Sequence, residues 1–114
     1  MKIINQTKDK VLAEEVFVAD TVGKRIKGLL GRKEFSYPEA LILKPANSIH
    51  TFFMRFPIDV LFVDKSNKVI KKICCFRPFR ISLVYFQSRL VIELPAGVVQ
   101  ASFTSEGDFL KFIY

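Results

Sequence analysis

The sequence predicts one mainly-β domain, a compact sandwich or jelly-roll-like barrel of about eight short strands with one amphipathic helix packed on it. Short apolar runs recur along the chain and are separated by turn residues, which is typical of such folds. Only one segment repeats apolar residues strongly at helical spacing. The chain has 114 residues, of which 50% are hydrophobic and 25% charged, so it can form one core and a single domain over 1–114.

The N-terminal region predicts a hairpin. Val11–Val18 carries apolar residues on both alternating faces, which indicates a strand covered in part on each side. We expect it to pair with Lys2–Asn5 across a turn at Lys8–Lys10.

The predicted helix follows this strand. Asp20 or Thr21 can cap its start, and Gly31 can end it. Its apolar residues, spaced at i, i+4, i+7 and i+8, are Val22, Ile26, Leu29 and Leu30. This spacing predicts a helix that lies on a sheet through its apolar face.

The rest of the chain predicts further strands. Pro57 marks a bend because proline cannot donate to a strand ladder. Arg77–Ser88 is looser, and Val98–Phe103 predicts a helical turn or two. The expected strands are Ala40–Lys44, Ile49–Phe56, Ile58–Asp64, Val69–Phe76, Arg89–Leu94 and Asp108–Ile113.

Cysteine usage and the N-terminus bear on location. Cys74 and Cys75 are adjacent, which disfavours a disulfide between them, and we expect both as small buried apolar groups. No Cys and His cluster suggests a metal site, and no motif suggests a cofactor. With no signal-like leader and no membrane-length apolar run, we expect a cytoplasmic protein without membrane contact.

The net charge of +7 is concentrated in one stretch. Residues 65–89 contain no Asp or Glu, whereas basic and acidic residues balance elsewhere. The basic residues are Lys65, Lys68, Lys71, Lys72, Arg77, Arg80 and Arg89. Interleaved aromatic residues would suit nucleic acid or another anionic surface, but a solvated basic face explains the same pattern.

Four segments together resemble a known family. They are Arg25–Arg32, Ile49–Asp64, Leu90–Gly97 and Gly107–Asp108, and they span nearly the whole chain. The chain resembles the bacterial and archaeal family called domain of unknown function 192, although Leu30 stands where that family usually has Met. The resemblance implies a small β-sandwich with a packed helix, and it implies no activity, substrate or cofactor.

Several polar residues in these segments are candidates for a site. His50 and Asp59 could form an acid–base pair, but a tight turn at residues 56–57 would separate them, and no obvious nucleophile is near. Arg55 either pairs internally with Asp59, Asp64 or Glu93 or faces an anionic ligand. The ligand-binding candidates are His50, Arg55, Asp59, Glu93, Arg25 and Arg32.

These observations favour a non-enzymatic module that binds a small anionic ligand or a protein partner. The first alternative is binding of nucleic acid or an anionic surface, with candidates Lys68, Lys71, Lys72, Arg77, Arg80 and Arg89. The second is a hydrolase-type enzyme that uses His50 as a base, Asp59 to orient it and Arg55 to stabilise negative charge. The sequence does not predict the oligomeric state.

Overall fold

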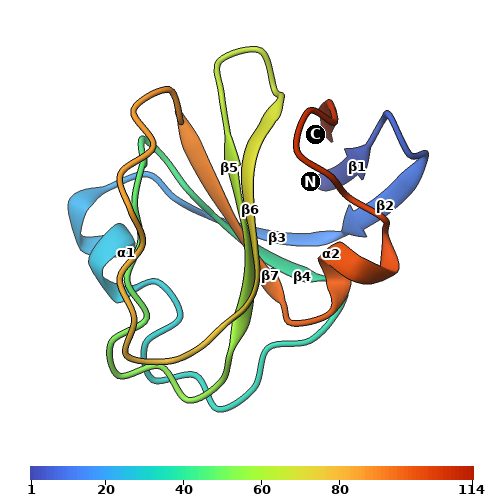
Figure 1. Ribbon diagram of the computed structural model, residues 1–114. Helices are drawn as coiled ribbons and strands as arrows, with labels where there is room; N and C mark the ends of the chain where they lie inside the picture. The colour runs from blue at the N-terminus through green and yellow to red at the C-terminus, as the bar shows by residue number, and fades with distance from the viewer.

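Two β-sheets pack against each other in the computed structural model, which describes residues 1–114 (Figure 1). The smaller sheet has the order β2-β1-β8, with β1 at Lys2–Asn5, β2 at Lys10–Ala13 and β8 at Leu110–Ile113. The larger sheet has the order β3-β4-β7-β5-β6. Its strands are β3 (Glu15–Ala19), β4 (Glu39–Leu43), β5 (Ile58–Val63), β6 (Val69–Phe76) and β7 (Leu90–Pro95). The predicted mainly-β sandwich is confirmed, and the sheets do not close into a barrel.

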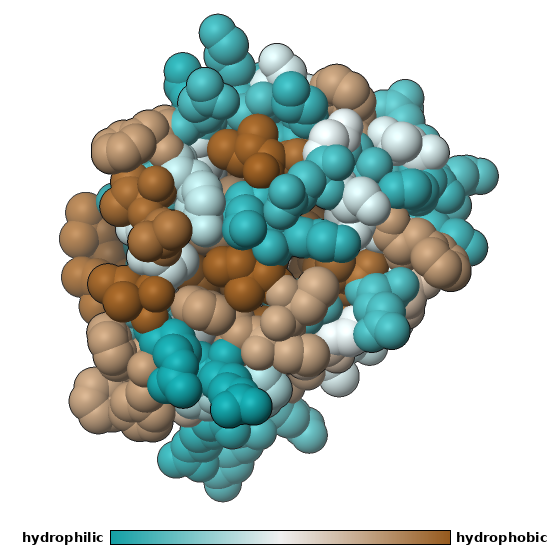
Figure 2. All heavy atoms as spheres, viewed as in Figure 1, coloured by the Kyte–Doolittle hydropathy of each residue, from teal (hydrophilic) through white to brown (hydrophobic).

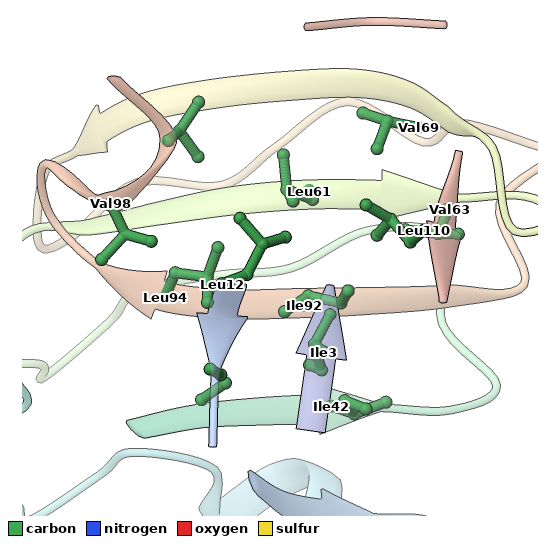
Figure 3. Close-up of a cluster of buried hydrophobic side chains, with 13 residues drawn as sticks. Ile3, Leu12, Ile42, Leu61, Val63, Val69, Ile92, Leu94, Val98 and Leu110 are labelled. Carbon is green, nitrogen blue, oxygen red and sulfur yellow. The ribbon is translucent and has the colours of Figure 1, made fainter. Parts of the chain in front are cut away.

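The first core lies between the two sheets (Figure 3). Ile3 and Leu12 of the smaller sheet are fully buried against the larger sheet, where Leu61, Ile92 and Leu94 point toward them. The short helix α2 (Val98–Ala101) closes one end of this layer through Val98 and Val99. Burial of these aliphatic side chains is the main favourable contribution that holds the two sheets together.

The second core lies on the opposite face of the larger sheet. Leu41, Val60, Phe62 and Val91 belong to it, and the turn after helix α1 (Val22–Lys27) covers it through Leu29. The larger sheet is therefore covered on both faces, and every residue of β5 is buried. This double coverage explains why strict polar–apolar alternation is absent from β5.

The helix differs from the prediction in length and in its apolar face. Thr21 caps it as expected, because Lys24 N–H donates to Thr21 Oγ1 over 3.2 Å. It ends at Gly28, which has φ +43°, rather than at Gly31. None of its residues is buried, and Ile26 is 63% exposed, so its predicted packing through an apolar face is wrong.

Two predicted strands are also different. Val11–Val18 is divided between the two sheets: β2 pairs with β1 as predicted, whereas β3 pairs in parallel with β4. Ile49–Phe56 forms no strand and pairs only locally with Arg77–Ser88. In that pairing Thr51 N–H donates to the Arg80 carbonyl and Ser82 N–H donates to the Ile49 carbonyl, each over 2.9 Å.

The two cysteines are exposed, so their predicted burial is wrong. They lie near the end of β6, an edge strand of the larger sheet, where Cys75 adopts φ +52° and interrupts the alternation of the strand.

Neither helix has the length and apolar character that crossing a membrane requires.

Candidate functional site

A cavity of about 250 Å³ lies between α1 and the second-core face of the larger sheet. Three parts of the chain line it: residues 25–30, residues 45–50 and the sheet, which contributes Leu43 and Glu93, with Met54 at one side. Apolar groups such as Leu29 and Leu43 form much of its wall. Its titratable side chains are Arg25, Lys27, His50 and Glu93.

Glu93 supplies the sheet's polar contribution to this cavity. It lies in the central strand β7, paired with Leu41 of β4 and Val60 of β5, whose side chains belong to the same face. Its side chain therefore faces the cavity, since directly paired residues share a face. The residue is 4% exposed, and its carboxyl group takes part in none of the hydrogen bonds or ion pairs of the structure. No fully buried side-chain oxygen lacks a hydrogen-bond partner, so the carboxyl oxygens of Glu93 keep a small exposure to the cavity. Burial raises the pKa of Glu93 to about 8, so the carboxyl group is largely protonated at neutral pH.

Arg25 and Lys27 come to the cavity from α1. The half-buried Arg25 guanidinium donates one hydrogen bond, from Nη1 to the Lys44 carbonyl over 3.3 Å. This contact ties the helix to the segment that follows β4 and leaves further N–H donors of Arg25 free. Both side chains can therefore contact an anionic group that enters the cavity.

His50 is held by its backbone neighbours. The buried Ile49 and Thr51 on either side of it bind the Arg77–Ser88 segment through hydrogen bonds. The His50 ring stacks on Phe52, and Nδ1 accepts a hydrogen bond from Phe52 N–H over 3.2 Å. An accepting Nδ1 carries no proton, so Nε2 carries it and acts as a donor. In this state Nε2 can bind an anion but cannot act as a general base.

Asp59 lies on the other face of the sheet. It pairs with Leu94, which belongs to the core between the two sheets. Its carboxylate accepts three backbone hydrogen bonds of 2.9–3.0 Å, from Cys75 N–H, Gly97 N–H and Val99 N–H. The acid–base pair of His50 and Asp59 is therefore not formed, because the two side chains lie on opposite faces of the larger sheet.

The two other candidate arginines lie outside the cavity. Arg32 pairs with Glu39, with 2.7 Å between Nη2 and Oε2, and lies near the rings of Phe17 and Phe35. Its hydrogen bond is the main cause that lowers the pKa of Glu39. Arg55 is exposed and takes part in none of the five ion pairs, so the first of its two alternatives, an internal pair with Asp59, Asp64 or Glu93, is not formed.

The basic stretch is divided in the structure. Lys71 pairs with Glu106 over 3.8 Å, and Lys72 Nζ donates to the Thr104 carbonyl over 3.2 Å. Lys68 and Arg77 lie beyond opposite ends of β6, roughly 30 Å apart at about 3.3 Å per residue. Arg77, Arg80 and Arg89 remain exposed. The predicted candidates therefore do not form one continuous patch.

The segment between β6 and β7 exposes apolar side chains beside these arginines. Leu83 is 74% exposed and Phe86 is 88% exposed, while the Phe53 and Phe79 rings meet edge to face at 5.5 Å. Figure 2 shows hydrophobic residues in brown reaching the surface among hydrophilic residues in teal. The sequence left open whether the aromatic side chains of this stretch are exposed or buried, and Phe79 and Phe86 are exposed.

Two larger hollows differ chemically from the cavity under α1. One of about 430 Å³ lies near the termini, and its charged lining residues are Lys44 and Lys111. The other, of about 660 Å³, lies beside α2 and has Lys10 as its charged residue. All three lysines are exposed, and neither hollow contains a buried acid. No three His, Cys, Asp or Glu side chains in the structure form a cluster that could hold a metal ion.

Part of the cavity was predictable from the sequence. Arg25, His50 and Glu93 were candidates, and the fold brings these three to one cavity. Lys27 and the polar residues Asn47 and Ser48 were not among the candidates. Lys27 lies inside the segment that carries the family resemblance, which was the one signal available for it.

The fold is that of a small β-sandwich protein with a cavity beside the short helix α1. Residues 3–112 match the sequence profile of domain of unknown function 192, described as an uncharacterized ACR. The chain belongs to this family.

Archaeal relatives extend the match over most of the chain. A UPF0127 protein of Thermococcus sibiricus is 36% identical over 110 residues, which is 93% of this chain and 71% of the relative. A UPF0127 protein of Pyrococcus furiosus is 33% identical over 115 residues, which is 96% of this chain and 97% of the relative.

Solved structures show the same fold. A crystal structure of a protein of unknown function from Novosphingobium aromaticivorans has a TM-score of 0.86 at 19% identity. The match covers 98% of this chain and 84% of the Novosphingobium chain. A crystal structure from Sinorhizobium meliloti, named as a candidate transcription regulator, has a TM-score of 0.80 at 19% identity. The match covers 96% of this chain and 89% of the Sinorhizobium chain. At this identity the likeness concerns the fold alone.

Proposed function

We propose that the protein is a binding module for a small organic anion, which enters the cavity under α1. Arg25 and His50 Nε2 contact the anionic group, and Glu93 contacts a polar group at the other end of the ligand. A buried carboxyl group without a partner, in a cavity that also contains cationic donors, is the observation that carries this proposal.

The chemistry of the donors supports binding rather than turnover. Arg25 keeps a permanent charge and free N–H groups, which suit a carboxylate or a phosphate. The hydrogen bond from Phe52 N–H to His50 Nδ1 leaves Nε2 as a donor. A hydrolase would need a base at this position, and the tautomer that Phe52 N–H favours supports a donor at Nε2 instead.

Titration calorimetry with small carboxylates and phosphates tests the proposal. We expect at least one of them to bind the wild type, and Arg25→Gln to weaken that binding by about tenfold, or about 1.4 kcal/mol. Lys24→Gln is the matched control, because Lys24 lies on the same helix but does not line the cavity. Equal binding to wild type and Arg25→Gln would contradict the proposal, as would failure of every ligand in the series to bind.

We infer a second candidate function for the segment between Arg77 and Arg89, the binding of a polyanion such as single-stranded nucleic acid. The exposed Arg77 and Arg80 favour it, together with the rings of Phe79 and Phe86, which are 53% and 88% exposed. Exposed aromatic rings can stack on bases while arginines contact phosphates.

A further inference from the structure

Glu93 places a carboxyl group in the cavity wall that the sheet forms, and no other side chain of the cavity pairs with this group. The side chain comes from the middle of the larger sheet, between Leu41 and Val60, where it is shielded from water. The other titratable groups of the cavity are Arg25 and Lys27 on α1 and His50 on the loop. None of them pairs with Glu93, and burial alone is the cause of the raised pKa of Glu93. The cations and the acid are therefore separate binding elements within one cavity.

These two elements require different groups on the same ligand. An anionic group suits Arg25 and His50 Nε2. A buried carboxyl group is best matched by an ammonium group, because ionised Glu93 then gains a charge partner and hydrogen-bond donors at a site with little exposure to water. A ligand without an amine would leave this carboxyl group without a charge partner.

We propose that the ligand is a small zwitterion whose ammonium group binds Glu93 and whose carboxylate or phosphate binds Arg25. This inference rests on the proposed function and deepens it by naming the ligand class. A cavity of about 250 Å³ has the volume of about eight waters at roughly 30 Å³ each, which accommodates a small amino acid or an aminoalkyl phosphate.

Binding of such a ligand has a measurable proton balance. The carboxyl group of Glu93 holds its proton in the empty cavity at neutral pH, because its pKa is about 8. When the ammonium group binds, Glu93 becomes a carboxylate and releases that proton to solvent, while the ligand keeps its own charge. Close to one proton per ligand should therefore leave the protein at pH 7.

Matched ligand pairs test the inference on the full chain. The pairs are 4-aminobutanoate with butanoate and 2-aminoethyl phosphate with ethyl phosphate, titrated at pH 7 in buffers of different ionisation enthalpy. We expect an amino compound to bind at least tenfold more tightly than its partner and to release close to one proton. Glu93→Gln should abolish both effects, whereas Lys24→Gln should leave both unchanged.

The outcomes separate this inference from the proposed function. If butanoate or ethyl phosphate binds as tightly as its amino partner without proton release, the zwitterion is wrong and anion binding stands. If Glu93→Gln keeps the preference for the amine, Glu93 is not its partner and the inference is wrong. If butylamine binds as tightly as 4-aminobutanoate, the anionic group is not needed and both proposals fail. If nothing in the series binds, both fail as well.

Discussion

Glu93 and Asp59 are buried acids on neighbouring central strands whose surroundings differ completely. Asp59 accepts three backbone N–H groups, whereas the carboxyl group of Glu93 has no hydrogen-bond partner. The first arrangement joins β5 to the end of β6 and to the start of α2. The second leaves an acid available to a ligand. The sequence marked both residues as candidates, but it could not separate their roles, because the role depends on which face of the sheet each side chain occupies.

Glu93 makes the stability of the empty protein depend on pH. Its folded pKa of about 8 lies above the usual value of 4.5, so its contribution to stability is fully present below pH 4.5 and is lost as the pH rises to about 8. The loss is about 1.4 kcal/mol per pH unit within this window. Glu93→Gln has no ionisable group here. The free energy of unfolding of this variant, relative to that of the wild type, should therefore increase as the pH rises. Urea denaturation at a series of pH values measures the difference, and parallel curves would contradict the prediction.

Asp59 should be a structural residue. In Asp59→Asn only one oxygen remains, and the amide NH2 must face a backbone N–H that needs an acceptor. We expect a loss of about 3 kcal/mol in the free energy of unfolding, because a buried donor is left unsatisfied. The matched control is Asp64→Asn, since Asp64 accepts both Ser66 N–H and Lys68 N–H on the single atom Oδ1. The control substitution should lower the free energy of unfolding by less than about 1 kcal/mol. Equal losses for the two variants in urea denaturation would show that the three hydrogen bonds to Asp59 do not stabilise the fold more than the two to Asp64.

At the scale of elements, the chain segment after α1 contributes more to packing than the helix does. Leu29 is 4% exposed and belongs to the second core, whereas Ile26 is 63% exposed. An amphipathic helix of the predicted length would bury both. We expect Leu29→Ala to lower the free energy of unfolding by about 2–4 kcal/mol and Ile26→Ala by less than about 0.5 kcal/mol. Similar losses for the two variants in urea denaturation would instead indicate that the helix is buried as the sequence predicted.

The sequence predicted elements well where local patterns determine them. Val69–Phe76 has the predicted bounds, because an apolar run follows a turn at Lys65–Lys68. The division of Val11–Val18 was not predicted, although two charged residues, Glu14 and Glu15, interrupt the apolar run at the point where the chain changes sheets. There Glu14 N–H and Glu15 N–H both donate to the Pro38 carbonyl, a contact between distant segments.

The Ile49–Phe56 segment shows the same limit near the cavity. Its Phe and Met residues predicted a strand, but its backbone meets Arg77–Ser88 only locally, and Phe53 adopts φ +63°. Strand propensity describes residues that fit a pleated surface, and this segment has no long neighbouring strand to pair with. The position of His50 in the cavity follows from this irregular backbone and could not be read from the sequence.

At the scale of the whole molecule, the cavity is assembled from a helix, a loop and the middle of a sheet. Arg25, His50 and Glu93 are separated by 25 and 43 positions along the chain, so no local motif could predict that they meet. The basic stretch shows the opposite relation between sequence and structure, because its residues are neighbours in the sequence but are separated in the fold. Residues that are close in the sequence are distributed along β6, and Lys71 and Lys72 contact the 104–106 turn.

The distribution of charge along β6 allows the polyanion candidate to be tested by comparing its two ends. Arg77 and Arg80 lie at one end of β6 beside exposed aromatic rings, and Lys65 and Lys68 lie at the other end. If the second candidate function is right, the double variant Arg77→Gln, Arg80→Gln should weaken binding to oligo(dT) and lower the slope of log affinity against log salt by about 1.4, or about 0.7 for each lost phosphate contact. The double variant Lys65→Gln, Lys68→Gln removes the same charge and should leave the slope nearly unchanged.

Fluorescence anisotropy between about 50 and 200 mM salt, a range over which phosphate contacts change affinity strongly, measures both slopes. Equal effects of the two double variants would mean that the net charge of +7, rather than the segment beside Phe79 and Phe86, attracts the polyanion. A further variant, Phe86→Ser, separates stacking from charge. It should lower affinity at every salt concentration without altering the slope, because an uncharged ring stacks on bases but releases no counterions.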